Sequence, residues 1–231
     1  MISSTKPSFV YLHSSDKYQT IYEYLCLKFP QIANDIWLDR IKRGKVHFKG
    51  GELIYFDTPY RADVKIVYYR EDPSERLVPF HEKILFENEN FLVVDKPHFL
   101  PVHPAGKYIR ETLTTRLQEK LNLPELNTAH RLDRLTAGLV LLCKKKKDRS
   151  HYQLLFQEQQ VKKTYECISH DTEGDQWHIK NRLIPSSVNS FLMQEADGIY
   201  NSESVIKKSS TQGDLAKFIL FPKSGKKHQL R

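Results

Sequence analysis

The chain has 231 residues, of which 36 are Lys or Arg and 28 are Asp or Glu, so its formal net charge is +8. That length suits one or two domains with a sizeable core. The 9 Gly and 11 Pro are too few for a low-complexity chain, and the many aromatic residues exclude disorder for most of it. The longest apolar run, residues 137–143, is far shorter than the roughly 20 residues of a membrane-spanning helix. We expect no signal peptide, because the first residues lack a basic segment followed by an apolar one.

The cysteines, Cys26, Cys143 and Cys167, are odd in number and form no C-x-x-C pair. This pattern argues against a disulfide framework and against a zinc knuckle, and it fits a reducing compartment. We therefore expect a cytoplasmic protein that does not associate with a membrane.

The positive charge is unevenly spread along the chain. Residues 1–75 carry 11 basic and 10 acidic side chains, a net charge of +1, whereas residues 130–165 carry 9 basic and 3 acidic ones, a net charge of +6. A solvated basic face explains such a segment, and so does a patch that faces phosphates. The charge alone does not choose between them.

Two short helices are predicted in the first third of the chain. Apolar residues over 21–29 have helical spacing, and Pro30 ends that pattern. Asn34 or Asp35 is the expected N-cap of the second helix, and Gly44 is its expected stop.

A small hairpin follows these helices. Apolar and polar residues alternate over 45–49 and 63–69, which predicts two strands. Residues 1–16 resemble a loose or extended arm, and residues 71–82, with charges and two prolines, resemble a linker.

The rest of the chain is richer in strand patterns. The expected strands are 83–86, 90–94, 138–143, 164–169 and 215–221, and the expected helices are 112–121 and 151–160. In the last helix Leu154, Leu155 and Phe156 should face inward, whereas residues 170–213 are weakly patterned. With no internal repeat, the pattern indicates an α+β fold in which strands dominate the larger unit.

The segment 128–138 places one carboxylate, Asp133, between Arg131 and Arg134, directly before a predicted strand. Asp133 and Thr136 are common turn residues, so a purely structural role is one interpretation. The other is a carboxylate kept ionised by the guanidinium groups, able to act as a nucleophile or base. No second carboxylate lies nearby in the sequence, which argues against a two-carboxylate hydrolase.

Four motifs in order resemble those of the RluA-type RNA pseudouridine synthases. They are NFLVVDKP at 90–97 with LPVHP at 100–104, HRLD at 130–133 with TAGL at 136–139, KTYECI at 163–168, and SGKKHQLR at 224–231. In addition, WLDRIKRGKV at 37–46 resembles the second helix and turn of an S4-like RNA-binding domain.

The resemblance implies isomerisation of uridine to pseudouridine in RNA without a metal, nucleotide or redox cofactor. Asp133 would be the nucleophile, Tyr165 would stack on the uracil and help to remove the C5 proton, and Arg231 would pair with Asp133. The uridine has to leave the helical stack to reach the carboxylate, so we expect base flipping. The candidate residues for binding substrate or RNA are His130, Arg131, Arg134, Lys96, Arg40, Lys42, Arg43 and Lys45. RNA contact by Lys144–Lys147 stays open.

The resemblance also implies a domain plan. It consists of an N-terminal arm (1–16), an S4-like RNA-binding domain (17–72), a linker (73–82) and a catalytic domain (83–231) built on a mixed, mainly antiparallel sheet. The expected partner is rRNA or tRNA rather than DNA, and we expect a monomer. His98, His103 and His130 lack the spacing of metal ligands, so no metal site is expected.

The sequence departs from the family pattern at Phe99, where Gly is usual, and at Ala137, where Ser or Thr is usual. A Phe should not adopt the positive φ that Gly would permit. The late motif normally opens onto further strands and a helix, so we expect a catalytic domain whose last part is missing. Residues 1–231 alone should then have reduced or absent activity. The alternatives are a non-catalytic RNA-binding module and a glycosidase acting on a free nucleoside.

Overall fold

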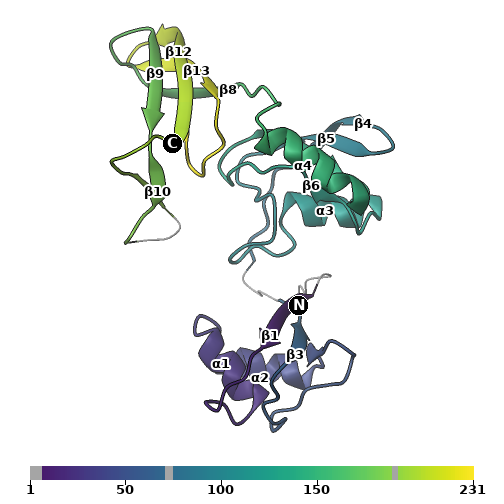
Figure 1. The fold of residues 1–231 in the computed structure, drawn as a ribbon. Helices are drawn as coiled ribbons and strands as arrows, with labels where there is room; N and C mark the ends of the chain where they lie inside the picture. The colour runs from purple at the N-terminus through teal and green to yellow at the C-terminus, as the bar shows by residue number, and fades with distance from the viewer. Residues whose placement is uncertain (1–6, 71–74, 189–191) are drawn as a thin grey trace. The chain divides into compact units, whose positions relative to one another are not determined.

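The computed structural model describes residues 7–70, 75–188 and 192–231. The chain divides into two compact units, residues 1–81 with 99–122 and residues 82–98 with 123–231. Figure 1 shows the helices and strands of the chain. Within the described ranges, no helix has both the length and the apolar character needed to cross a bilayer.

The first unit begins with a helical pair and a small sheet. Its elements are β1 (Ser8–Leu12), α1 (Ile21–Lys28), α2 (Asn34–Lys42), β2 (Val46–Phe48) and β3 (Val64–Tyr68). The strands form an antiparallel sheet in the order β1-β3-β2, which confirms the expected pairing of the two hairpin strands. The N-terminal arm is more ordered than expected, because β1 pairs along its length with β3. Residues 1–6 of that arm lie outside the described residues.

The helix ends follow local capping chemistry, with one correction. The Thr20 hydroxyl accepts a hydrogen bond from the Glu23 N–H (3.1 Å), which starts α1. The N-cap of α2 is Ala33, so neither Asn34 nor Asp35 caps it. Ala33 has no side-chain atom that could accept a hydrogen bond from the first backbone N–H groups of α2, so the start of α2 depends on packing rather than on an N-cap side chain.

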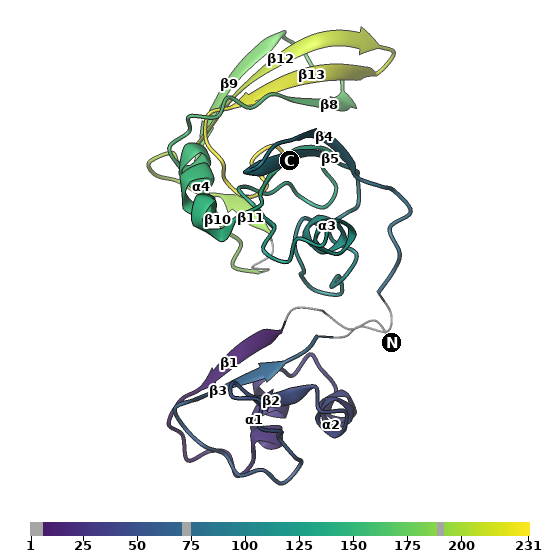
Figure 2. The same cartoon turned by 90° about the vertical axis from the view of Figure 1, so that its right-hand side faces the viewer.

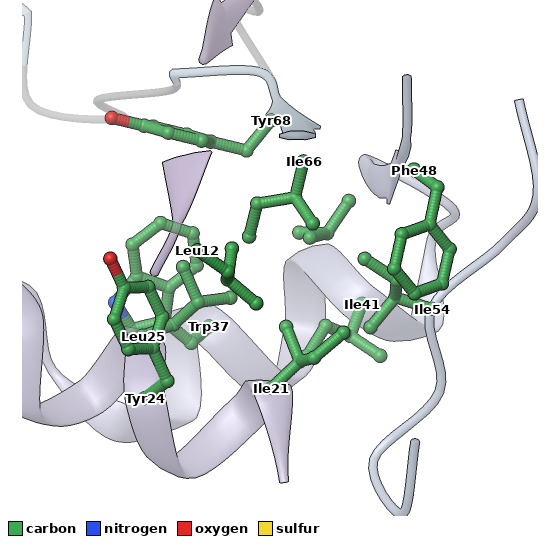
Figure 3. Packing of buried hydrophobic residues seen from close by; sticks show 11 residues of the cluster. Leu12, Ile21, Tyr24, Leu25, Trp37, Ile41, Phe48, Ile54, Ile66 and Tyr68 are labelled. Atoms are coloured by element: carbon green, nitrogen blue, oxygen red, sulfur yellow. The ribbon is translucent and has the colours of Figure 1, made fainter. Parts of the chain in front are cut away.

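Apolar side chains from both helices and the inner face of the sheet form the core of this unit (Figure 3). Trp37 and Leu25 from the helices and Ile66 from β3 are fully buried. Truncation of such a side chain to Ala costs about 2–5 kcal/mol in a well-packed core, so this cluster holds the helices on the sheet.

The remainder of the first unit contains α3 (Leu113–Leu121), which starts at the N-cap Thr112. Glu75, within the predicted linker, accepts hydrogen bonds from the backbone N–H groups of Ile109 (2.7 Å) and Glu111 (2.7 Å). Phe99 adopts φ +67°, so the expectation that Phe excludes a positive φ was wrong. That conformation costs about 1–2 kcal/mol, and the contact of the Phe99 ring with Phe80 (5.9 Å between centroids) helps to offset it.

The second unit contains two sheets, the first made of four antiparallel strands. These are β4 (Lys83–Glu87), β5 (Phe91–Lys96), β6 (Asn127–Thr128) and β7 (Gly138–Cys143), in the order β4-β5-β7-β6. A 3-10 turn η1 (Lys146–Asp148) leads into α4 (Arg149–Gln157), whose Tyr152 ring meets Phe91 of β5 (5.4 Å). Leu155 and Phe156 are half-buried, but Leu154 is exposed, which corrects the prediction that all three face inward.

The second sheet combines two predicted strands, 164–169 and 215–221, with two strands in the segment 170–213, where the sequence predicted no element. Its strands are β8 (Tyr165–His170), β9 (Gln176–Asn181), β12 (Ser202–Gln212) and β13 (Leu215–Pro222), in the order β8-β13-β12-β9 (Figure 2). The strands β10 (Leu183–Pro185) and β11 (Met193–Glu195) pair separately. The outer half of β12 is polar and exposed, so no alternation marked it. In β9, Trp177 and Ile179 do alternate with polar residues, but this short pattern was not recognised as a strand in the sequence. The observed fold is α+β with mainly antiparallel sheets, as predicted.

Candidate active site

A cleft of about 1010 Å³ lies in the second unit. Its walls come from the loop 129–136 before β7, from α4, from the start of β8 and from residues 220–231 at and after the end of β13. Asp133, Tyr165 and Arg231 all line it, although they are far apart in the sequence.

Asp133 uses its backbone and its side chain for different purposes. Its carbonyl oxygen accepts a hydrogen bond from the Thr136 N–H (3.1 Å), which closes the turn before β7. Its carboxylate instead faces the Arg231 guanidinium and the His228 ring, with Oδ2 at 3.4 Å from Nε of Arg231 and 3.9 Å from Nε2 of His228. The main chain therefore makes the turn, and the carboxylate is available for chemistry in the cleft.

Tyr165 opens β8 and pairs with Leu220 of β13. Burial raises the pKa of its hydroxyl, and the negative charge of Asp133 raises it further. At neutral pH the ring is therefore an uncharged, half-buried aromatic surface on the cleft wall. Such a surface can stack on a planar base.

Gln229 holds the turn that carries Arg231. Its Nε2 donates to the carbonyl oxygen of Glu203 (3.0 Å) and to Oγ of Ser204 (2.8 Å). Its Oε1 accepts from Oγ of Ser224 (2.8 Å) and from the Lys226 N–H (3.0 Å). All four hydrogen-bonding positions of the amide are used, so the turn is fastened to the start of β12.

His130 fastens the opposite wall. Its Nε2 accepts a hydrogen bond from the Leu141 N–H of β7 (3.1 Å), and its ring stacks on Phe156 of α4 (4.2 Å between centroids). Burial lowers the pKa of His130 to about 4, and the charge of Lys163 acts in the same direction. His130 is thus a neutral acceptor that positions the loop, rather than a cation facing RNA.

Lys96, also a predicted RNA-binding residue, is fully buried at the end of β5. Its Nζ donates to the carbonyl oxygens of Pro97 (2.9 Å) and Arg134 (3.5 Å). Burial lowers the pKa of Lys96 to about 8, while the charge of Asp133 opposes that shift. Through its hydrogen bond to the Arg134 carbonyl oxygen, the ammonium group helps to hold the loop that carries Asp133.

The family relationship rests on most of the second unit together with residues 99–122 of the first. Residues 90–231 match the family described as RNA pseudouridylate synthase, and this range contains all of the cleft. The chain belongs to this family. The resemblance of the four sequence motifs is therefore confirmed.

Individual synthases of the family match over longer stretches. The mitochondrial tRNA pseudouridine(32) synthase of Saccharomyces cerevisiae is 30% identical over 211 residues, which cover 88% of this chain and 45% of that protein. The human pseudouridylate synthase RPUSD2 is 28% identical over 206 residues, covering 80% of this chain and 37% of that protein. The chain thus spans less than half the length of these curated relatives.

A solved structure of a related protein can be compared with the fold of this chain. Human RNA pseudouridylate synthase domain containing 4 is 26% identical and superposes with a TM-score of 0.51, over 64% of this chain and 61% of that chain. The antiparallel sheets of the second unit therefore belong to the pseudouridylate synthase fold.

The synthase cleft has a cationic rim. Arg131, Lys163, Lys226, Lys227 and Arg231 line it, and Nζ of Lys163 also donates to the carbonyl oxygen of Ser224 (3.1 Å). Arg134 is exposed but is not among the lining residues, and Lys144 pairs with Glu87 (2.5 Å). Within the described part of the chain, no group of three or more His, Cys, Asp or Glu side chains could hold a metal ion.

The predicted RNA-binding residues of the first unit differ in exposure. Arg40 is buried, with its guanidinium over the Trp37 ring (5.0 Å), so its position does not suit a phosphate contact. Lys42 and Arg43 are at the surface, and Lys45 lies with its Nζ over the Tyr69 ring (5.5 Å).

Four residues of the site were missed by sequence reasoning: His228, Gln229, Lys163 and Ser224. All four fall inside the quoted motifs, so the motifs located them without giving their roles. Their roles depend on hydrogen bonds to β12 and on the approach of His228 to Asp133, which only the fold creates.

Proposed function

We propose that this chain forms the catalytic part of an RNA pseudouridine synthase, which isomerises uridine to pseudouridine with Asp133 as the nucleophile. The observation that carries the proposal is the Asp133–Arg231 pair, 3.4 Å apart in a cleft that Tyr165 also lines. An arginine beside a carboxylate favours its charged, nucleophilic form.

The reaction is an isomerisation, so nothing is gained or lost overall. The carboxylate of Asp133 attacks C1′ as the N1–C1′ bond of the uridine breaks, and the uracil turns on the ring of Tyr165. C5 of the uracil then bonds to C1′ and displaces the carboxylate, C5 loses its proton, and N1 takes one up. The chain's own residues bind, orient and shield the base, and the reaction needs no cofactor.

The cationic rim is suited to the RNA backbone on either side of a flipped uridine. Extrusion of a base costs a few kcal/mol, which stacking on Tyr165 and phosphate contacts offset. Two yeast relatives are named tRNA pseudouridine synthases, for positions 32 and 31. We therefore favour tRNA over rRNA as the substrate.

The first unit contributes to binding in this proposal. We infer that residues 17–72 form an S4-like RNA-binding domain, joined by residues 73–82 to the catalytic domain 83–231. Its surface residues Lys42, Arg43 and Lys45 are the candidate phosphate contacts. The proposal includes a monomer that acts in the cytoplasm.

The test is to map pseudouridine in cellular RNA after an Asp133→Asn change in the gene. We expect one or a few specific pseudouridines to disappear, while RNA affinity of the purified variant stays close to that of the wild type. The matched control is Asp175→Asn, at an exposed carboxylate outside the cleft. An unchanged map would reject the nucleophile and favour a non-catalytic RNA-binding module, and release of free uracil from nucleosides would favour a glycosidase.

A further inference from the structure

The small sheet of the first unit has two faces of opposite character. Register places Val10, Leu12 and Ile66 on the face that packs against α1 and α2. Their neighbours along each strand therefore point to the other face, because side chains alternate across a strand.

That second face is aromatic and basic. Phe9 lies opposite Val67, which lies opposite His47, while Tyr11 lies opposite Lys65. Tyr69 follows β3 and bonds through its N–H to the carbonyl oxygen of Lys45 (3.1 Å), which puts these two residues on the same face. We call this set the aromatic face: Phe9, Tyr11, His47, Tyr69, Lys45 and Lys65.

Two of its four rings, Phe9 and Tyr11, are open to solvent, whereas His47 and Tyr69 are half-buried. Phe9 is 51% exposed and Tyr11 is 45% exposed, on a strand where Val or Thr would satisfy the sheet equally well. Phe9 and Tyr11 are two residues apart on β1, so their exposed rings lie on the same face of the sheet, and adjoining exposed apolar side chains are typical of a binding surface. The rings of the aromatic face are therefore candidates for contact with a ligand.

Cations are interleaved with these rings. Nζ of Lys65 lies over the Phe9 ring (4.3 Å), and Nζ of Lys45 lies over the Tyr69 ring (5.5 Å). Lys49 extends the row, because its N–H donates to the carbonyl oxygen of Lys65 (2.9 Å). One acidic group approaches, since the Tyr11 hydroxyl donates to Asp63 (3.4 Å). The balance on this face is positive, so the partner that fits it is an anion.

Flat rings with interleaved cations on an open sheet match one ligand chemistry. Bases of a single strand stack on aromatic side chains, and the adjacent lysines contact the phosphates between them. A duplex hides the faces of its bases and does not fit such a surface. A folded acidic protein would use the lysines but not the row of rings.

We propose that the aromatic face is a second RNA-binding surface, which takes a single-stranded segment by stacking bases on Phe9 and Tyr11. The surface lies in the first unit, outside the residues that line the cleft. This proposal depends on the proposed function only because both take RNA as the partner of the chain. Its role is to hold unpaired RNA independently of the uridine that reacts.

The test uses the whole chain and a fluorescent single-stranded oligouridine of about ten nucleotides. The Phe9→Leu/Tyr11→Leu double variant keeps apolar strand residues but removes both rings, and we expect it to bind at least about tenfold more weakly. Phe9→Tyr, which keeps a ring, should retain wild-type affinity. Lys65→Gln should lower the slope of log affinity against log salt by about 0.7.

The matched control is Tyr200→Leu. Tyr200 is 51% exposed, and Nζ of Lys180 lies over its ring (5.0 Å), so the substitution removes the same kind of pair elsewhere. This variant should bind like the wild type. Equal loss in the control, or equal affinity of the wild type for a duplex of the same length, would overturn the proposal.

Photo-crosslinking gives a second readout that tolerates a stability change in the variants. An oligonucleotide with 5-iodouracil should crosslink to the peptide that contains Phe9 and Tyr11, and crosslinks confined to residues 129–231 would contradict the proposal. Neither measurement needs turnover. The proposal that the aromatic face binds RNA can therefore be rejected while Asp133-dependent formation of pseudouridine persists, or confirmed while that activity is absent.

Discussion

The guanidinium of Arg231 reaches the carboxylate of Asp133, with Nε 3.4 Å from Oδ2, although the two residues belong to segments next to different sheets. Asp133 precedes β7 of one sheet, and Arg231 follows β13 of the other. Each segment has its own anchor, His130 to Leu141 on one side and Gln229 to Glu203 on the other. The pair therefore depends on two local anchors as well as on its own attraction.

Arg231→Gln should lower kcat by about 100-fold, because Asp133 loses the guanidinium that orients its carboxylate, and misplacement of a reacting group typically costs that much. RNA affinity should change little, since the other cations of the cleft remain. Single-turnover pseudouridine formation and anisotropy binding with the gene product measure the two effects. The matched control Arg76→Gln, at an exposed arginine outside the cleft, should leave both unchanged. A variant with full kcat would remove Arg231 from the site.

Gln229→Ala should act through Arg231. It removes the hydrogen-bond partner of two acceptors, the Glu203 carbonyl oxygen and Ser204 Oγ, and of two donors, the Ser224 hydroxyl and the Lys226 N–H. This loss costs about 1–3 kcal/mol of stability. It should also lower kcat without a comparable rise in KM. If Gln229 only positions Arg231, the double variant with Arg231→Gln should be no slower than Arg231→Gln alone.

Additive losses in that cycle would contradict a positioning role for Gln229. Gln194→Ala, at an exposed glutamine of β11, controls for the substitution itself and should match the wild type in both stability and kcat.

The sequence predicted three of the four strands in the first sheet of the second unit, because a buried run such as 138–143 has a clear apolar signal, and it missed only the two-residue β6. It failed over 170–213, where β12 bears Lys, Ser and Gln on exposed faces and is held by its pairing with β9 and β13. Such long-range pairing leaves no local pattern.

The sequence motifs predicted where the site lies, but they did not predict the role of each residue in it. Lys96 and His130 were predicted to bind substrate or RNA, yet burial makes one a support for backbone carbonyls and the other a neutral acceptor. Burial of a single polar side chain is a property of packing, which composition does not reveal. The expected continuation of the catalytic domain beyond Arg231 stays a prediction.

Lys96→Met should keep the fold but lower kcat. Loss of the bonds to the Pro97 and Arg134 carbonyls is destabilising, while removal of a buried ammonium group relieves its desolvation cost, so the two effects largely cancel. The loop that carries Asp133 nevertheless loses its support. Thermal unfolding and kcat measure the two consequences, and Lys83→Met, at an exposed lysine of β4, is the matched control. Wild-type kcat in Lys96→Met would show that the loop needs no such support.

His130 makes the cleft sensitive to acid. Its pKa of about 4 in the folded protein lies below the value of 6.5 for a free histidine, so between pH 6.5 and 4 only the unfolded chain takes up the proton. Stability should fall as the pH drops through that window, by up to about 3 kcal/mol at the lower end, and should not depend on His130 above pH 6.5.

His130→Gln can still accept from the Leu141 N–H but cannot titrate, so the variant should lose this part of the pH dependence. Urea unfolding at pH 4.5, 5.5 and 7 compares it with the wild type and with His170→Gln, at an exposed histidine of β8. The protection factor of the Leu141 amide against hydrogen exchange should fall in acid in the wild type only, because a protonated ring repels the N–H that it had accepted from. Identical pH profiles for wild type and His130→Gln would show that the loop before β7 is held by Phe156 stacking and backbone bonds rather than by the neutral imidazole.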